Sequence, residues 1–254
     1  GGTINILEYC KHHRAGLILL STSRVYSVPP LAVLPVEIHQ RAFRPKAGAT
    51  LPDGLTVAGV GEAFSTAPPI SLYGSSKLAS EVIALEYADT FHFPVWINRC
   101  GVLAGAGQFG KADQGIFSFW INSHLRRRPL KYIGFDGGGH QVRDCLHPRD
   151  LVPALLAQMK YRGHEQPRIS NFSGGAANAM SLVQLTEWCV ARFGKHAVAS
   201  DANPRPFDIP WMVLDSSQAA KAWNWAPAIS MENILDEIAK HAEQHPDWLE
   251  ISGS

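Results

Sequence analysis

Short apolar runs alternate with helically spaced apolar positions over the first hundred residues. Residues 3–13 carry apolar side chains at roughly helical spacing, and the wholly apolar run 16–20 follows and ends in three polar residues. This pattern predicts a helix and then a buried strand. Helical spacing returns over residues 75–90, and residues 93–98 form a second short strand candidate. The order strand, helix, strand is typical of a parallel sheet.

The rest of the chain continues this alternation after a long irregular segment. Between residues 28 and 69 Pro and Gly are frequent and no period is sustained, which predicts a surface excursion with only short elements. Beyond it we predict strands over residues 131–135 and 168–172 and helices over residues 181–192 and 231–241. These patterns together predict an α/β fold built on a mostly parallel sheet.

Composition and charge restrict the class of protein and its partners. With 254 residues, of which 46% are hydrophobic and 18% charged, the chain can bury a sizeable core. A formal net charge of +1 gives no overall field to attract nucleic acid or an anionic membrane, so we expect neither as a partner. No run reaches the ~18 apolar residues of a membrane span. The four cysteines are widely spaced, which predicts neither a disulfide framework nor a metal site and favours a cytoplasmic location.

One short segment carries candidate chemistry. Tyr73 and Lys77 are four residues apart, so a helix would place the phenol and the ammonium on one face. The pair alone is weak evidence, because this spacing arises often by chance. Its context strengthens it, since one apolar strand ends at Thr22 and another ends near Gly101. A hydroxyl, a Tyr/Lys helix and a Gly-bearing strand end can then converge at the carboxyl edge of a sheet, where ligands bind in open α/β folds.

These residues and several further motifs resemble the extended short-chain dehydrogenase/reductases, the NAD-dependent epimerase/dehydratase family, and within it the CDP-paratose 2-epimerase (CDP-tyvelose epimerase) branch. The resemblance covers nearly all of the chain. The matching stretches are residues 2–8 (GTINILE), 21–26 (STSRVY), 71–77 (SLYGSSK), 141–144 (QVRD), His147 with Asp150, and 204–210 (PRPFDIP).

The resemblance implies NAD as cofactor and a nucleotide-diphosphate sugar as substrate. Tyr73 would be the general base, and Lys77 would favour the phenolate, because a free tyrosine with a pKa near ~10 is a poor base at neutral pH. Thr22 would hydrogen-bond the reacting hydroxyl. Ser21, Tyr73, Lys77, Cys100 and Val102 would contact the cofactor; for Cys100 a plain packing role is equally compatible with the sequence.

Two arginines are candidates for binding the diphosphate. The guanidinium groups of Arg143 and Arg205 match phosphate oxygens, and a near-neutral protein needs such local cations. The alternative is that each pairs with a neighbouring acid, Asp144 or Asp208.

The family's Gly-rich dinucleotide fingerprint and its ribose-binding acid occur nowhere in these 254 residues. We therefore expect a partial Rossmann-like doubly wound parallel sheet, without its N-terminal βα units, and a smaller C-terminal α/β substrate-binding lobe. Residues 1–110 would form the second half of the NAD-binding domain, and residues 111–254 mainly the sugar-nucleotide lobe, with roughly 143–175 returning to the Rossmann-like domain. We expect this chain by itself to be inactive.

The implied reaction is epimerisation through transient oxidation to a keto sugar and hydride return to the opposite face, at carbon 2 of a CDP-deoxyhexose. A 4,6-dehydratase is disfavoured, because those enzymes carry Asp-Glu where this chain has Ser23 and Arg24. Another epimerase, dehydratase or reductase of the family and a non-catalytic nucleotide-binding fragment stay open as alternatives, as does a homodimer.

Overall fold

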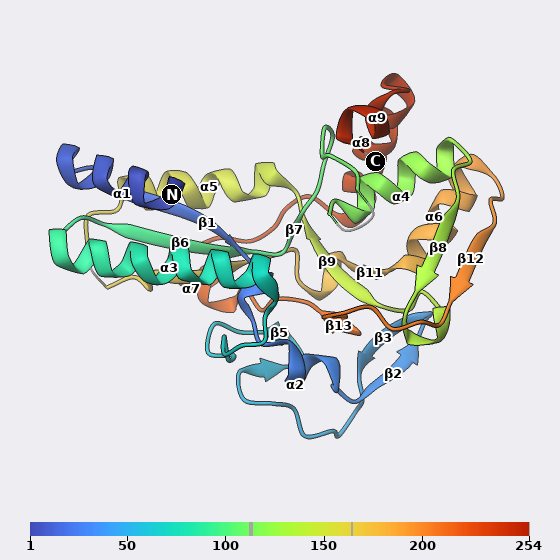
Figure 1. The fold of residues 1–254 in the computed structure, drawn as a ribbon, viewed down its shortest axis with the longest axis horizontal. Helices are drawn as coiled ribbons and strands as arrows, with labels where there is room; N and C mark the ends of the chain where they lie inside the picture. Colours follow the sequence, from blue (N-terminus) through green and yellow to red (C-terminus); the bar gives the residue numbers. More distant parts are fainter. Residues whose placement is uncertain (112–113, 164, 254) are drawn as a thin grey trace.

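A computed structural model describes residues 1–111, 114–163 and 165–253. It divides into a lobe centred on a parallel sheet and a second lobe rich in helices, joined by small strands (Figure 1). The α/β class and the parallel sheet predicted from the sequence are both confirmed.

The central sheet has three parallel strands, in the order β1 (Leu17–Thr22), β6 (Val95–Cys100) and β10 (Ile169–Phe172). All six residues of β6 are buried, as expected for a strand covered on both faces. Because the strands are parallel, their carboxyl ends meet at one edge, where Thr22 lies opposite Cys100.

Helices cover both faces of this sheet. On the face of Val95 and Ile97 lie α1 (Gly2–His13) and α3 (Ser71–Phe91). On the opposite face, beside Trp96, lie α5 (Pro148–Lys160) and α7 (Ser217–Trp223). The layers of Figure 1 follow this division.

The segment between residues 28 and 69 corrects a prediction. It holds only short elements, as expected: α2 (Val28–Ala32), β2 (Val36–His39), β3 (Ala42–Pro45), β4 (Leu55–Thr56) and β5 (Gly59–Val60). It is not merely a surface excursion, however. Its buried Leu31, Val60 and Phe64 form one apolar cluster with Val213 and Leu214 from the far end of the sequence.

The second lobe packs helices against a two-stranded parallel sheet. Its elements are α4 (Ile116–Leu125), β8 (Leu130–Ile133), α6 (Leu182–Phe193), β12 (Val198–Asp201), α8 (Met231–Gln244) and α9 (Trp248–Ser252). Ser181 begins α6 with a capping box, and Ser230 caps α8 through its hydroxyl, which explains where both predicted helices start.

Small strands connect the two lobes. β9 (Val142–Leu146) pairs with β7 (Val102–Leu103), β11 (Ala179–Ser181) and β13 (Trp211–Met212). Three short 3-10 turns complete the described elements, at Ser23–Val25 (η1), Phe135–Gly137 (η2) and Ala176–Asn178 (η3). Among the residues that the structure describes, no helix is long and apolar enough to cross a membrane.

Candidate active site

The carboxyl end of β1 carries the first predicted catalytic residue. Thr22 is the last residue of the strand, and its Oγ1 accepts a hydrogen bond of 3.2 Å from the backbone N–H of Arg24. This bond closes the η1 turn, which follows the strand directly. The Thr22 hydroxyl is therefore fixed at the edge where the three parallel strands end.

The helix α3 carries the other two. It begins at Ser71, four residues before the predicted start, so Tyr73 and Lys77 both lie on it. The Ser71 hydroxyl accepts from the N–H of Gly74 at 3.2 Å and so occupies one donor of the first turn. Lys77 Nζ lies 5.8 Å from the centroid of the Tyr73 ring. The Tyr73 side chain is half exposed, and a ligand can reach it.

A glycine brings these two segments together. A Cβ atom at Gly74 would collide with the carbonyl oxygen of Arg24, so the first turn of α3 rests directly on the η1 turn. The residue before Gly74 is Tyr73, and the turn is bonded to Thr22. The structure thus brings Thr22, Tyr73 and Lys77 to one edge of the sheet, as the sequence predicts.

A buried charged network lies beneath this edge, and no motif in the sequence indicated it. Glu81 and Arg99 are 1% and 5% exposed, and Arg99 Nη2 donates to Glu81 Oε2 at 2.7 Å. Ser21 donates its hydroxyl proton to the same carboxylate. Arg99 also donates to the hydroxyl of Tyr26, which in turn donates to Asn171 Oδ1 at 2.7 Å.

The network separates the roles of two tyrosines. Burial raises the pKa of Tyr26 to about 12, although the neighbouring Arg99 acts in the opposite direction. Tyr26 therefore keeps its proton at neutral pH and is unsuited to act as a base. Tyr73, which has a cation beside it and access to solvent, is the better candidate.

Two of the predicted cofactor contacts have buried side chains. The Ser21 hydroxyl donates a hydrogen bond to Glu81. The Cys100 side chain is 4% exposed, and burial raises the pKa of its thiol to about 12. Both positions favour packing roles. Val102 begins β7 and pairs with Cys145 of β9. Contact of these three residues with a cofactor stays a prediction.

The two predicted phosphate ligands differ in how they are held. Arg143 lies on β9 and donates to the carbonyls of Val142 and Ile209 at 2.8 and 2.9 Å, and its Nη2 lies 3.5 Å from Asp208 Oδ1. Arg143 thus pairs with an acid, as the alternative prediction required, but its partner is Asp208 and not Asp144. The guanidinium of Arg205 is exposed and makes no hydrogen bond or ion pair within the described ranges.

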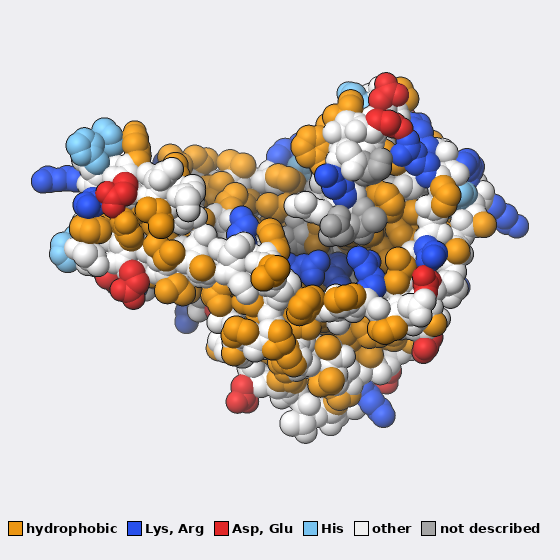
Figure 2. Space-filling view, in the orientation of Figure 1, with side chains coloured by type: hydrophobic (Ala, Val, Ile, Leu, Met, Phe, Trp, Pro, Cys, Tyr) orange, Lys and Arg blue, Asp and Glu red, His pale blue; other side chains and the backbone are white. Residues whose placement is uncertain are grey.

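These arginines belong to one cationic surface. Burial lowers the pKa of Arg143 to about 10; Asp208 counteracts this, and the positive charges of Arg24 and Arg205 add to it. The guanidinium groups of Arg24 and Arg205 are therefore each close enough to Arg143 to repel it. Figure 2 shows Lys and Arg side chains gathered in the hollow between the two lobes. A polyanion bound there would relieve this repulsion.

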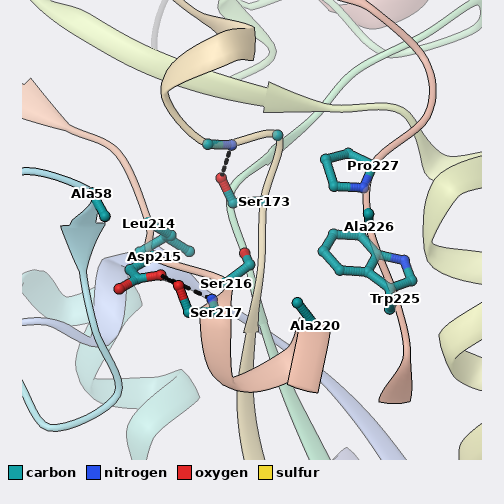
Figure 3. Close-up of a pocket in the computed structure, with 12 residues that line it drawn as sticks. Ala58, Ser173, Leu214, Asp215, Ser216, Ser217, Ala220, Trp225, Ala226 and Pro227 are labelled. Atoms are coloured by element: carbon teal, nitrogen blue, oxygen red, sulfur yellow. Dashed lines mark hydrogen bonds between the residues drawn. The ribbon is translucent and has the colours of Figure 1, made fainter. Parts of the chain in front are cut away.

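A separate pocket lies beside β10 and α7 (Figure 3). It has a volume of about 240 Å³, and none of the predicted site residues lines it. At its wall Asp215 Oδ1 accepts from the N–H of Ser217 at 2.8 Å, so this carboxylate is occupied locally. Among residues 1–111, 114–163 and 165–253, no three His, Cys, Asp or Glu side chains gather so as to hold a metal ion.

Comparison with known proteins decides the family. The model of the NAD dependent epimerase/dehydratase family matches residues 1–172. The chain belongs to this family. UDP-glucuronate 4-epimerase of Thermodesulfobacterium geofontis is 27% identical over 247 residues, which cover 96% of this chain and 64% of that protein. CDP-paratose 2-epimerase of Salmonella typhi is 24% identical over 249 residues, which cover 94% of this chain and 68% of that protein.

Solved structures of other proteins share the fold of this chain. UDP-glucuronic acid 4-epimerase from Bacillus cereus, in complex with UDP-glucuronic acid and NAD, superimposes with a TM-score of 0.72 at 24% identity; the match covers 95% of this chain and 66% of that one. The chain thus spans about two thirds of the length of these relatives. The CDP-paratose 2-epimerase branch is one of several at similar identity, so the branch stays a prediction.

Proposed function

We propose that this chain carries the catalytic and sugar-binding residues of an NAD-dependent nucleotide-sugar epimerase. The observation that carries the proposal is the meeting of Thr22, Tyr73 and Lys77 at the carboxyl edge of the sheet, where Arg24 of the η1 turn also lies close enough to Arg143 to act on its pKa. Family membership supports it, as do relatives that are named as epimerases of nucleotide sugars.

The donors at this edge suit the nicotinamide end of NAD. The Tyr73 hydroxyl and the Lys77 ammonium are hydrogen-bond donors, and the ammonium lies over the Tyr73 ring and forms no ion pair within the described residues, so both groups can bind the hydroxyls of a ribose. When bound there, NAD would take a hydride from the sugar carbon and return it.

The protein's own groups then move the proton and hold the sugar. Tyr73 removes the hydroxyl proton of the reacting carbinol as hydride leaves its carbon, and it gives the proton back when the ketone is reduced. Tyr73 acts as the phenolate and is the neutral phenol while it holds the proton, and the Lys77 cation stabilises the phenolate before the proton is taken and after it is returned. Thr22 hydrogen-bonds the same hydroxyl and keeps it in line with Tyr73. Reduction of the opposite face requires the keto sugar to turn while its diphosphate stays held by Arg143 and Arg205.

Two sugar classes follow from the available support. The motifs favour carbon 2 of a CDP-linked deoxyhexose, whereas UDP-glucuronate 4-epimerase, a relative of similar identity, acts by its name at carbon 4. The proton couplings of the product distinguish these positions, because inversion at either carbon changes a different pair of ring couplings.

The test uses the complete product of the gene that encodes this chain, with NAD and CDP-paratose or UDP-glucuronic acid in deuterated water. Because the hydride returns to the carbon that lost it, we expect an epimer without carbon-bound deuterium. Tyr73→Phe should lower kcat about 10²- to 10⁴-fold, the usual contribution of a general base. Tyr9→Phe on the exposed face of α1 is the matched control. Substantial deuterium incorporation, or an unimpaired Tyr73→Phe variant, would reject the mechanism.

A further inference from the structure

The buried pair of Glu81 and Arg99 stands directly beneath the three candidate catalytic residues. Glu81 follows Lys77 by one helical turn on α3. Arg99 precedes Cys100, the residue opposite Thr22 in the sheet, and Ser21, which donates to Glu81, precedes Thr22 itself. One carboxylate therefore ties α3 to the carboxyl ends of both β1 and β6.

The bonding of Glu81 also decides what Lys77 can do. Residues four apart on a helix commonly form ion pairs, so Glu81 is a natural partner for Lys77. Instead, both oxygens of Glu81 accept from Arg99, at 3.2 Å from Nε and 2.7 Å from Nη2. Lys77 makes no ion pair with any described residue, and its ammonium lies over the Tyr73 ring.

We propose that Glu81 and Arg99 are positioning residues for the Tyr73–Lys77 pair. Their bonds hold the helix against the two strand ends, and their mutual neutralisation leaves the Lys77 ammonium to act on Tyr73. The inference rests on the proposed function only in taking Tyr73 as the base. The effect of the pair's charges on Tyr73 can be measured on the folded chain without substrate.

This arrangement predicts that replacing Glu81 and replacing Arg99 have opposite effects on the pH at which Tyr73 loses its proton. Tyr73 is eight residues before Glu81, which corresponds to ~12 Å along the helix. At an effective dielectric constant of ~20, an unpaired charge at that distance changes the pH at which the phenol loses its proton by up to about 1 pH unit. Glu81→Gln leaves a cation behind and should let Tyr73 lose its proton at lower pH. Arg99→Met leaves an anion and should raise that pH.

No variant replaces the other charged or titratable groups around the pair and Tyr73. They are Lys77 on α3, Arg24 in the η1 turn, Tyr26 beyond it, and Glu62, whose Oε1 accepts from the N–H of Asn171. Burial raises the pKa of Glu62, and Tyr26 keeps its proton to about pH 12. The difference between variants therefore reports the pair itself.

The experiment is a pH titration of the Tyr73 ring by carbon-13 NMR in the 254-residue chain, with Tyr73→Phe to assign the signal. We expect Glu81→Gln to shift the midpoint down, Arg99→Met to shift it up, and the double variant to return it to within about 0.3 pH unit of the unaltered chain. Asp89→Asn, which opens the exposed ion pair with Arg168 at the far end of α3, should not move it.

Equal midpoints in all variants, or shifts of the same sign in both single variants, would overturn the inference. If Arg99→Met does not fold, Arg99→Lys replaces it as the charge-conserving control, and an unmoved midpoint in Glu81→Gln alone then suffices to reject the proposal. Failure of the proposed function would appear separately, as absence of epimer in the assay above, and would leave these midpoints unaffected.

Discussion

At the scale of single residues, the two candidate phosphate ligands should respond differently to truncation. Charge-assisted contacts contribute ~1.5–3 kcal/mol each, so Arg205→Ala should weaken binding of UDP-glucose or CDP-glucose by roughly 10- to 150-fold without loss of stability. Arg143→Ala should weaken binding as much and also destabilise the fold, because it removes bonds to two backbone carbonyls.

Calorimetric titration measures the affinity and urea unfolding the stability. Arg14→Ala serves as the control, because Arg14 follows α1 at the opposite end of the sheet from the candidate site. If both variants at Arg143 and Arg205 bind as tightly as the unaltered chain, these arginines do not hold the diphosphate.

Asp144 should make the stability of this protein depend on pH. Burial raises its pKa to about 6, although the N–H of Leu214 and the hydroxyl of Ser173 donate to it and act in the opposite direction. Since the folded state then binds this proton more tightly than the unfolded state, stability is greatest below the unfolded value near ~4 and falls as pH rises to about 6.

Comparison with Asp144→Asn isolates this contribution. Between pH 4 and pH 6.5 the unaltered chain should lose roughly 2 kcal/mol of unfolding free energy that the variant does not lose, because a pKa difference of one between the folded and unfolded states corresponds to ~1.4 kcal/mol and part of the change falls below pH 4. Urea unfolding at several pH values measures the difference. Parallel pH profiles for the two proteins would mean that Asp144 is already ionised in the fold at pH 4.

The sequence located Thr22, Tyr73 and Lys77 because their spacing and strand-end context carry a signal. It could not locate Glu81 and Arg99. A glutamate in a helix and an arginine in a strand are ordinarily read as exposed charges, and only the packing of α3 against the sheet brings Glu81 and Arg99 together. The one hint in the sequence is that Arg99 lies in a short strand candidate with apolar neighbours, since an arginine in a buried strand must have a partner.

At the scale of elements, the start of α3 depends on Gly74. Alanine is the better helix former by about 1 kcal/mol, so propensity alone predicts that Gly74→Ala stabilises the helix. The structure predicts the opposite, because the added methyl would meet the carbonyl oxygen of Arg24 and must displace the helix from the η1 turn. We expect a loss of ~1–3 kcal/mol, as for overpacking elsewhere.

Urea unfolding of Gly74→Ala and Ser75→Ala provides the comparison. Ser75 is the next residue on the helix and is exposed, so its replacement should be neutral or slightly stabilising. A stabilised Gly74→Ala variant would contradict the close contact between α3 and the η1 turn.

Elements with a clear period or cap were predictable, and the others were not. The helix α6 ends within one residue of the prediction, and its Ser181 cap is visible in the sequence. The helix α4 is buried nearly all round, with polar as well as apolar side chains, and shows no clear period, while α5 contains Pro153 and reads as interrupted. Neither could be predicted from the sequence, because tertiary burial, and not local pattern, stabilises them.

At the scale of the whole molecule, the outer edge of β1 should cause association. Within the described residues β1 pairs with β6 alone, which leaves one row of backbone groups open. Exposed apolar side chains flank it, namely Leu20 on the strand, Ile6 on α1 and Met159 on α5. We expect concentration-dependent association of the 254-residue chain through this edge.

Charged substitutions test where the contact lies. Leu20→Lys with Met159→Lys should shift sedimentation toward the monomer, whereas Val57→Lys, at an exposed position in the β4–β5 turn, should not. A chain that stays monomeric at all concentrations, or one that associates equally with both lysines in place, would show that this edge is not adhesive.

The chain passes between the two lobes more than once, and this limits how its gene can be recombined with that of a homologue. The chain leaves the central sheet after β6, builds α4 and β8, and returns to place β10 beside β6 before it forms the rest of the second lobe. A single crossover between residues 69 and 213 of two homologous genes would separate the 28–69 segment from Val213 and Leu214, and one between β6 and β10 would also separate these two strands. An exchange of the second lobe between homologues would therefore require several discontinuous stretches to be exchanged together.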